Sequence, residues 1–141
     1  MPELPEVETI VRGLAHAITG KTIQKVAVRL PKMAVAPVGV DFKKALRGER
    51  VRSVTRRGKY SVIALGSGRR LIVSLRMTGR LIVLAAGQAR LKYEHVSLFF
   101  SDGSRLAFAD SRQFGRVRLV EPGEPWDAQL GVEPLSGDFT P

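Results

Sequence analysis

Apolar residues near the start of the chain recur with the spacing of one helix face. The pattern i, i+3, i+4, i+7, i+11 is formed by Val7, Ile10, Val11, Leu14 and Ile18. Pro5 suits the first helical turn, because its missing N–H is not needed there. Gly20 is a typical helix stop. The pattern predicts an amphipathic helix over residues 5–19.

After Gly20 the period changes to the alternation that is typical of strands, with turn signals such as GSG and SDGS between the runs. Eight runs are predicted as strands: Thr22–Leu30, Arg50–Thr55, Tyr60–Leu65, Arg70–Leu75, Arg80–Leu84, His95–Phe100, Arg105–Ala109 and Arg116–Val120. Eight strands at short spacing predict a mainly β fold, either a β-sandwich or a barrel, with the N-terminal helix packed on it.

The remaining segments lack a strong period. Residues 31–41 carry prolines and a glycine and are predicted as a loop, after which Asp41 could cap a short helix over residues 42–47. Residues 121–141 are rich in Pro, Gly and acidic residues. They are predicted as a linker with one short helix near residues 126–130, which leaves residues 1–120 as the folded domain.

Charge narrows the class of partner. The 141 residues include 23 Lys and Arg against 13 Asp and Glu, a formal net charge of +10. Such an excess indicates a polyanionic partner, with nucleic acid first and an anionic membrane surface second. A solvated basic surface without a dedicated partner remains the plain alternative.

Several classes are excluded or disfavoured by composition. The absence of cysteine removes disulfides, a catalytic thiol and Cys-ligated zinc from this chain, and two histidines do not make a His-rich metal cage. No basic segment followed by an apolar run resembles a signal peptide, and no stretch has the length of a membrane span. We therefore expect a soluble intracellular protein without a cofactor in this chain.

The first residues, MPELPEVETI, combine a proline at position 2 with nearby carboxylates. If Met1 is removed, Pro2 becomes a secondary amine with a pKa of about 8, so a sizeable share is unprotonated and nucleophilic near neutral pH. Attack on a sugar C1′ would give an iminium, with Glu3 able to move protons and Glu6 able to hold charge or water. The alternative is that this stretch only starts the helix.

Five segments, in the same order, resemble the bacterial formamidopyrimidine-DNA glycosylase family. They are PELPEVE at the start, RRGKY at 56–60, SLRMTGRL at 74–81, EHV at 94–96 and DSRQFGR at 110–116. The resemblance covers essentially the whole chain. It implies the family's N-terminal domain, an eight-stranded two-sheet β-sandwich with an N-terminal helix.

The resemblance also implies an activity. Members are bifunctional glycosylases and lyases of base-excision repair, which remove 8-oxoguanine and formamidopyrimidines through a proline Schiff base and β,δ-elimination. By resemblance, Pro2 is the nucleophile, Glu3 the catalytic acid and Glu6 the second acidic residue. Lys59 resembles the hairpin lysine near the lesion and its phosphates, although a basic turn is also a common solvated hairpin.

Met77, Arg112 and Phe114 resemble the residues that this family inserts where the damaged base has left the stack. Apolar side chains fill the space, and the donor-only fork of Arg112 suits the acceptors of an orphaned cytosine. From the residues alone, Met77 and Phe114 could equally belong to the core. His95 and Arg76 are candidate phosphate contacts, with structural roles as the alternative.

Two departures weaken the expected grip on DNA: Ser74 stands where many members have His, and Gln113 where Arg or Lys is common. Members continue into a helix–two-turn–helix element and a zinc finger, so we expect residues 121–141 to lead toward a C-terminal domain that carries one structural zinc. The isolated fragment is then expected to bind DNA weakly and to be weakly active or inactive.

The expected partner is double-stranded DNA that contains oxidised purines, with no membrane involved. The protein is expected to be a monomer in the bacterial cytoplasm, associated with the nucleoid. Two alternatives remain: an endonuclease VIII-like glycosylase for oxidised pyrimidines, and a non-catalytic module that binds damaged DNA.

Overall fold

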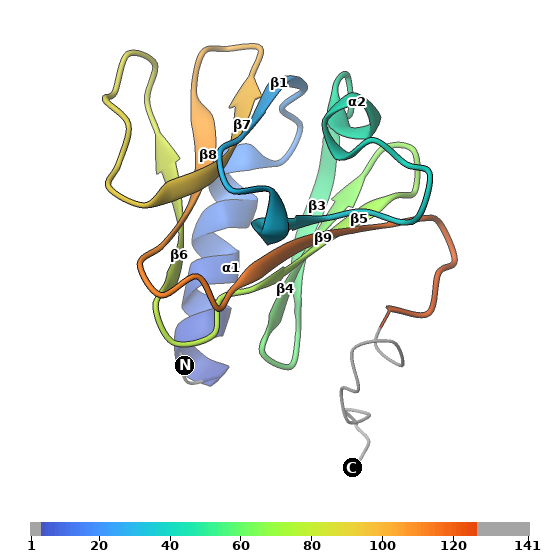
Figure 1. Ribbon diagram of the computed structural model, residues 1–141, viewed down its shortest axis with the longest axis horizontal. Helices are drawn as coiled ribbons and strands as arrows, with labels where there is room; N and C mark the ends of the chain where they lie inside the picture. Colours follow the sequence, from blue (N-terminus) through green and yellow to red (C-terminus); the bar gives the residue numbers. More distant parts are fainter. Residues whose placement is uncertain (1–3, 127–141) are drawn as a thin grey trace.

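The chain folds as two facing β-sheets with one long helix along an open side (Figure 1). A computed structural model describes residues 4–126, with side chains from Glu8 onward. The mainly β class, the sandwich and the N-terminal helix are thus confirmed, and the barrel alternative is not what forms. No helix within residues 4–126 is long and apolar enough to cross a membrane.

The smaller sheet has four strands in the order β1-β7-β8-β6, and the larger has five in the order β2-β9-β5-β4-β3. Their bounds are β1 Ile23–Val28, β2 Ala34–Val35, β3 Val51–Arg57, β4 Tyr60–Leu65, β5 Arg70–Ser74, β6 Gly79–Leu84, β7 Glu94–Phe100, β8 Arg105–Asp110 and β9 Arg116–Val120. All neighbours are antiparallel except β2 and β9, which are parallel.

All eight predicted strands form, and β2 is a ninth that the sequence pattern did not indicate. It lies in the predicted loop, directly after the 3-10 helix η1 (Pro31–Met33). Met33 is fully buried and anchors this segment, and β2 then pairs with Val117 and Arg118 of β9. A two-residue strand is too short to show an alternation, so only the tertiary contact determines it.

Helix α1 (Leu4–Ile18) packs its predicted apolar face on both sheets. Val11, Leu14 and Ile18 are buried, and the helix contacts β3, β4 and β6. Because β3 and β6 are edge strands of different sheets, α1 covers the seam between them. The position of α1 is therefore set by both sheets.

The short helix α2 (Phe42–Leu46) forms as predicted. Asp41 is its N-cap, and its side chain accepts a hydrogen bond from the Lys44 amide at 3.0 Å. Phe42 and Leu46 are buried beneath it, and the helix packs on β1. Asp41 thus supplies a partner for an otherwise unsatisfied amide of the first turn.

The predicted linker begins docked on the larger sheet. Trp126 is buried against Val62, Ile72 and Val120, and its ring meets Tyr60 edge-on at 5.6 Å. The predicted helix near residues 126–130 lies outside the described residues beyond Trp126. The first part of the linker thus packs on the outer face of the sheet.

Candidate nucleic-acid interface

Four segments that carry predicted site residues lie at one end of the sandwich. They are the start of α1 and the turns that join β3 to β4, β5 to β6 and β8 to β9, all toward the bottom of Figure 1. Strand register explains the alignment, because Tyr60 pairs with Ser74 and Ser74 pairs with Arg116. Residues distant in sequence are thereby placed at one edge.

The chain's first residues precede α1, which begins at Leu4. Pro2 and Glu3 lie outside the described residues, as does the side chain of Glu6. In the next turn, Glu8 Oε1 accepts from Arg56 Nε at 2.8 Å, and the same carboxylate pairs with Arg12 at 3.3 Å. The hydrogen bond from Arg56 lowers the pKa of Glu8. This contact joins the early part of α1 to the β3–β4 hairpin.

Lys59 lies at the tip of that hairpin, in the turn after Arg57. Its side chain is exposed, and Gly58 before it adopts a φ of 59° that favours glycine. Arg56 also donates to the Gly58 carbonyl at 3.2 Å, so the arginine that contacts α1 also braces this turn. Lys59 is thus presented beside the beginning of α1.

Met77 and Phe114 are not core residues. Met77 is 61% exposed in the β5–β6 turn, and Phe114 is 46% exposed in the β8–β9 loop. The interpretation that places them in the core is therefore wrong for both. The Arg112 guanidinium lies over the Phe114 ring, 5.0 Å from its centroid. Exposed apolar side chains beside a stacked arginine are suited to contact nucleic-acid bases.

Asp110 connects the two loops that carry these side chains, and sequence analysis gave it no role. It is 1% exposed, and its carboxylate accepts from the Thr78 hydroxyl, from the Arg112 amide at 3.1 Å and from the Gly115 amide at 2.7 Å. Burial alone would raise the pKa of Asp110, but these hydrogen bonds outweigh it and lower the pKa. A buried ionised carboxylate thus fixes Met77, through Thr78, relative to Arg112.

Arg76 and Phe114 line a pocket of about 200 Å³ on the outer face of the larger sheet. Its other lining residues are Val35, Tyr60, Ile72, Ser74, Arg116 and Arg118. Arg76 has a φ of 58°, an uncommon conformation for a non-glycine residue. Three arginines and no carboxylate line the pocket, and of the three only Arg118 makes an ion pair within the described residues, with Glu124 at 3.5 Å. The remaining positive charge favours anions.

The two departures from the family pattern lie beside this pocket. Ser74 lines it, and Gln113 has a φ of 62° and accepts from Arg116 Nη1 through its carbonyl at 2.9 Å. Arg116 also donates to the Gly115 carbonyl at 2.7 Å. Arg116 therefore orders the β8–β9 loop through its backbone.

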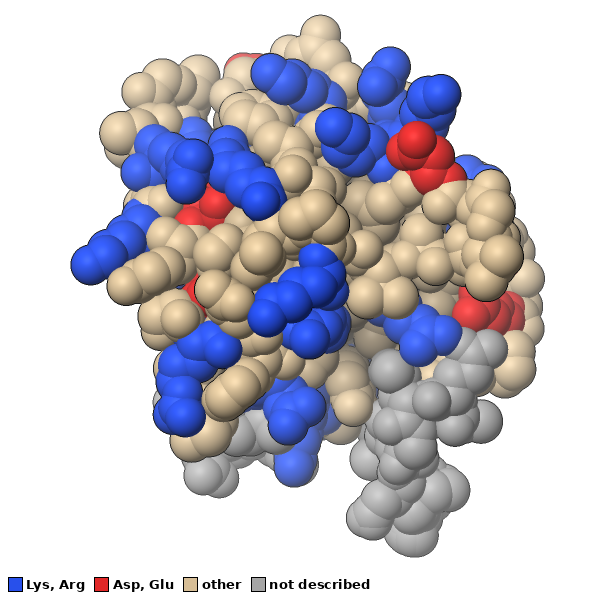
Figure 2. Space-filling view, viewed as in Figure 1, with Lys and Arg blue, Asp and Glu red and all other residues tan. Residues whose placement is uncertain are grey.

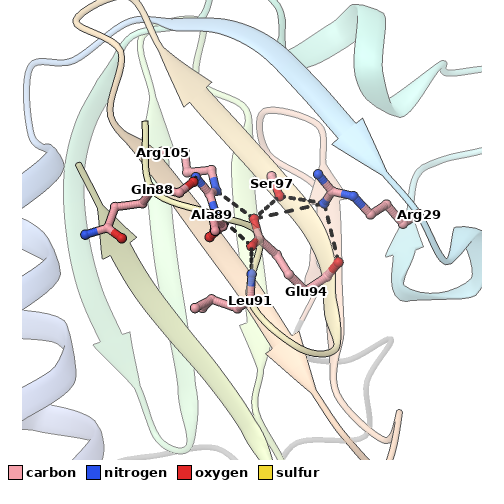
Figure 3. Close-up of polar contacts among 7 residues, drawn as sticks. All are labelled: Arg29, Gln88, Ala89, Leu91, Glu94, Ser97 and Arg105. Atoms are coloured by element: carbon pink, nitrogen blue, oxygen red, sulfur yellow. Dashed lines mark hydrogen bonds and ion pairs between the residues drawn. The ribbon is translucent and has the colours of Figure 1, made fainter. Parts of the chain in front are cut away.

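His95 lies near the same loop, with its Nε2 2.9 Å from the Asp110 carbonyl oxygen. One ring nitrogen is thereby engaged within the protein, which leaves Nδ1 for an external contact. Its neighbour Glu94 is fully buried and belongs to the polar network of Figure 3.

The centre of that network is an ion pair between Glu94 and Arg105. Arg105 donates to both carboxylate oxygens, at 2.7 and 3.0 Å, and Ser97 and the Leu91 amide donate at 2.5 and 2.8 Å. The rest of the Arg105 guanidinium reaches the carbonyls of Gln88 and Ala89, both at 2.9 Å. The pair thus fastens the loop before β7 to the sheet, directly beside His95.

Within residues 4–126, no group of three or more His, Asp or Glu side chains could hold a metal ion. Figure 2 shows many Lys and Arg side chains and few Asp and Glu, spread across the face from its upper to its lower end. Lys59, Arg76 and Arg112 add positive charge at the end that bears the predicted site residues.

The sequence matches the family model described as the formamidopyrimidine-DNA glycosylase N-terminal domain over residues 1–117. The chain belongs to this family. A formamidopyrimidine-DNA glycosylase of Heliobacterium modesticaldum is 46% identical over 99% of the chain, and one of Pelotomaculum thermopropionicum is 45% identical over 99%. The chain spans about half the length of these curated relatives, 53% and 52%.

Solved glycosylases of the family share the fold. The Lactococcus lactis enzyme in complex with DNA that contains FAPY-dG superposes with a TM-score of 0.82 at 33% identity, covering 92% of this chain and 48% of that one. MutM in complex with DNA that contains carbocyclic 8-oxo-G gives a TM-score of 0.83 at 35% identity, with 92% and 48% covered. The two-sheet architecture is therefore the family's N-terminal domain.

Proposed function

We propose that this chain is the catalytic half of a bifunctional DNA glycosylase and AP lyase that removes oxidised purines in base-excision repair. One observation carries the proposal: the turns that bear Lys59, Met77, Arg112 and Phe114 lie at one end of the sandwich, where α1 also begins. Membership of the family and the solved relatives with lesion-containing DNA support the same reading.

The chemistry proposed for Pro2 starts with its free secondary amine, after loss of Met1. Its nitrogen lone pair attacks C1′ while the bond to the oxidised base breaks, and the base leaves with that electron pair and takes up a proton. Glu3 is proposed to transfer this proton, and Glu6 to hold charge or water. Loss of the nitrogen proton gives a neutral aminal. Its nitrogen lone pair then expels O4′, which takes up a proton as the sugar ring opens, and C1′ becomes part of an iminium. Its electron-withdrawing character permits proton loss at C2′ and expulsion of the 3′ phosphate, followed by δ-elimination of the 5′ phosphate.

The role proposed for Met77, Arg112 and Phe114 is to occupy the duplex after the lesion leaves the stack. Extrusion of a base costs a few kcal/mol, about what apolar wedges can offset by restoring contact with neighbouring bases. The guanidinium of Arg112 can donate to O2 and N3 of an unpaired cytosine, which rationalises lesions opposite C. Lys59 is proposed as a further catalytic residue, close to the lesion and its phosphates, and Arg76 and His95 are proposed phosphate contacts.

The parent protein is proposed to continue into a C-terminal domain with a helix–two-turn–helix element and one structural zinc. The structural zinc is proposed to lie in that C-terminal half. Residues 1–120 are then the catalytic domain and 121–141 the connection. We propose a monomer that acts on nucleoid DNA in the bacterial cytoplasm.

Borohydride trapping tests the reaction. We expect the chain, incubated at high concentration with abasic-site duplex and borohydride, to give a covalent adduct that Pro2→Gly lowers by at least about tenfold. Duplex binding should change by less than about twofold, because Pro2→Gly alters the nucleophile rather than the basic surface. Intact mass spectrometry provides the control, since retained Met1 blocks the amine.

Trapping also discriminates the alternatives. If a protein that joins this sequence to its C-terminal half binds lesion DNA but yields no adduct with processed Pro2, the enzyme reading is wrong and a binding module remains. Faster trapping on an oxidised pyrimidine than on 8-oxoguanine opposite C would favour the endonuclease VIII-like alternative.

DNA binding by the 141-residue chain alone should be weak and salt-dependent. Binding should be weak because the chain supplies only part of the proposed DNA-binding surface and so makes few phosphate contacts. Each of these contacts releases counterions, so the affinity should fall steeply between about 50 and 200 mM salt. Fluorescence anisotropy with an abasic-analogue duplex measures this. Nanomolar binding at physiological salt would contradict the expectation, and Lys59→Ala should reduce the salt slope by about one.

A further inference from the structure

The open edge of β1 and the helix α2 enclose a groove far from the proposed DNA site. The groove measures about 630 Å³ and is lined by Gln24, Lys25, Val26, Lys43, Arg47, Phe99, Phe100 and Gly103. In Figure 1, β1 and α2 lie near the upper end of the sandwich, opposite the turns described above. The seven residues of β3 run between these two ends, which places them roughly 20 Å apart.

The three cations that line this groove make no ion pair within residues 4–126. Lys43 lies in α2, and Arg47 is the C-cap residue directly after it. Both are exposed and line the groove, and neither makes an ion pair within the described residues. Lys25, also exposed, lies 5.4 Å from the centroid of the Phe99 ring. Figure 2 shows Lys and Arg side chains gathered over this end.

The carboxylates nearest to the groove are already engaged. Asp41 caps α2 through the Lys44 amide, and Asp102 pairs with Lys21 at 2.9 Å. No carboxylate is among the lining residues. The groove therefore carries an excess of positive charge, reduced only in part by the attraction between Asp41 and Lys43, above a floor that includes Val26 and Phe100.

The edge of β1 offers free backbone groups beside these cations. Arg29 donates its amide to the His95 carbonyl at 2.7 Å, one step past the Val28–Val96 pair. In an antiparallel ladder, every second residue of a strand directs its N–H and C=O toward the neighbouring strand. Because Arg29 does so toward β7, the N–H and C=O of Val26 and Val28 point away from β7. Within residues 4–126, no other strand pairs with β1 over this stretch.

The neighbouring part of the edge is already used. Ile23 donates its amide to the Glu49 carbonyl at 2.8 Å and accepts from the Gly48 amide at 2.7 Å. The open stretch therefore begins after Ile23, alongside the groove. An extended chain can add to such an edge by main-chain hydrogen bonds, while side-chain pockets select its sequence.

We propose that this groove binds an extended acidic segment of a partner protein, added as a strand on β1. Its backbone pairs with Val26 and Val28, its carboxylates face Lys25, Lys43 and Arg47, and alternate apolar side chains rest on the floor. A duplex is a poorer fit, because its phosphates gain nothing from an apolar floor and can use only the N–H groups of the strand edge, not its carbonyls. The site is independent of Pro2 and of the proposed reaction.

Fluorescence anisotropy with a labelled eight-residue peptide of alternating Glu and Val tests the proposal on the 141-residue chain, in about 100 mM salt to screen diffuse charge. Lys43→Glu should weaken binding at least about tenfold, whereas Lys44→Glu, with the same charge change one residue along α2 but outside the groove lining, should change it less than about twofold. Both side chains are exposed, so both variants should fold.

A peptide N-methylated at alternate residues, which cannot pair as a strand, should lose at least about tenfold in affinity. Amide exchange of Val26 and Val28 should slow when the unmodified peptide binds. Equal weakening by Lys43→Glu and Lys44→Glu would overturn the proposal in favour of diffuse attraction. No effect of N-methylation would exclude strand addition. If duplex DNA displaced the peptide, and Lys43→Glu abolished this binding of the duplex, the groove would be a nucleic-acid surface instead.

Discussion

Replacing Glu94 by glutamine should lower the free energy of unfolding by about 3–5 kcal/mol, the usual cost of breaking a buried ion pair by removing one charge. The Arg105 side chain is 7% exposed, and its ion pair with Glu94 is the only one it makes within the described residues. In the variant, Arg105 would keep its charge without a carboxylate partner. Denaturant unfolding of Glu94→Gln measures the loss. The matched control is Glu121→Gln, which removes the half-exposed pair with Arg69 and should cost less than about 1 kcal/mol.

Two further measurements bear on this prediction. Equal costs for Glu94→Gln and Glu121→Gln would contradict it. A double variant that replaces Glu94 and Arg105 by Leu and Met should recover part of the loss, because it leaves no unpaired buried charge.

The Glu94 contribution should also depend on pH. Burial by itself would raise the pKa of Glu94, but hydrogen bonds from Arg105, Ser97 and the Leu91 amide outweigh it and lower the pKa to about 2. A carboxyl with a lowered pKa stabilises the fold above its unfolded pKa of 4.5, and this stabilisation is lost as the pH falls from there toward 2. The stability difference between wild type and Glu94→Gln should therefore shrink from pH 6 to pH 3.

Gly115→Ala should destabilise the chain by about 1–3 kcal/mol and displace the β8–β9 loop. A Cβ on Gly115 would lie 2.6 Å from the Ser74 carbonyl oxygen, 2.7 Å from Phe108 Cζ and 3.0 Å from Asp110 Oδ2. The first is backbone and the second belongs to a buried ring, so the loop has to move. Because its amide donates to Asp110, the movement should also disturb the anchor between the Met77 and Arg112 segments.

Gly13→Ala is the matched control, since a Cβ there meets nothing within 4 Å and alanine favours the helix. It should stabilise by up to about 1 kcal/mol. Denaturant unfolding curves give the stabilities of both variants. Anisotropy with abasic-analogue DNA should show weaker binding for Gly115→Ala only. Unchanged stability and binding would refute the close packing at Gly115.

The fold could be predicted from the sequence where a local period or turn residue fixes it. Helix α1 follows from its apolar face, and α2 from Asp41, because both signals act within one or two turns. Strand β2 could not be predicted, since two residues show no period and its partner β9 lies about eighty residues away in the chain.

Part of the candidate site could likewise be predicted from sequence motifs, and part of it only the fold reveals. Motif resemblance indicated Met77, Arg112 and Phe114, and the structure places all three at one end, although the roles proposed for them rest on that resemblance. Asp110 lay inside a quoted motif but received no role, because its three partners come from two loops that only the fold brings together. Likewise, nothing in the period of β1 revealed that one edge stays open.

The seam covered by α1 has a consequence for how the chain folds during synthesis. The helix leaves the ribosome before the strands of either sheet, yet one of the edges it covers, β6, ends only at Leu84. Strand β1 can pair with β7 only later, because β7 ends at Phe100. A nascent chain therefore exposes the apolar face of its first helix until most of the domain has been translated, and its many non-local pairings favour slow folding with an early need for chaperones.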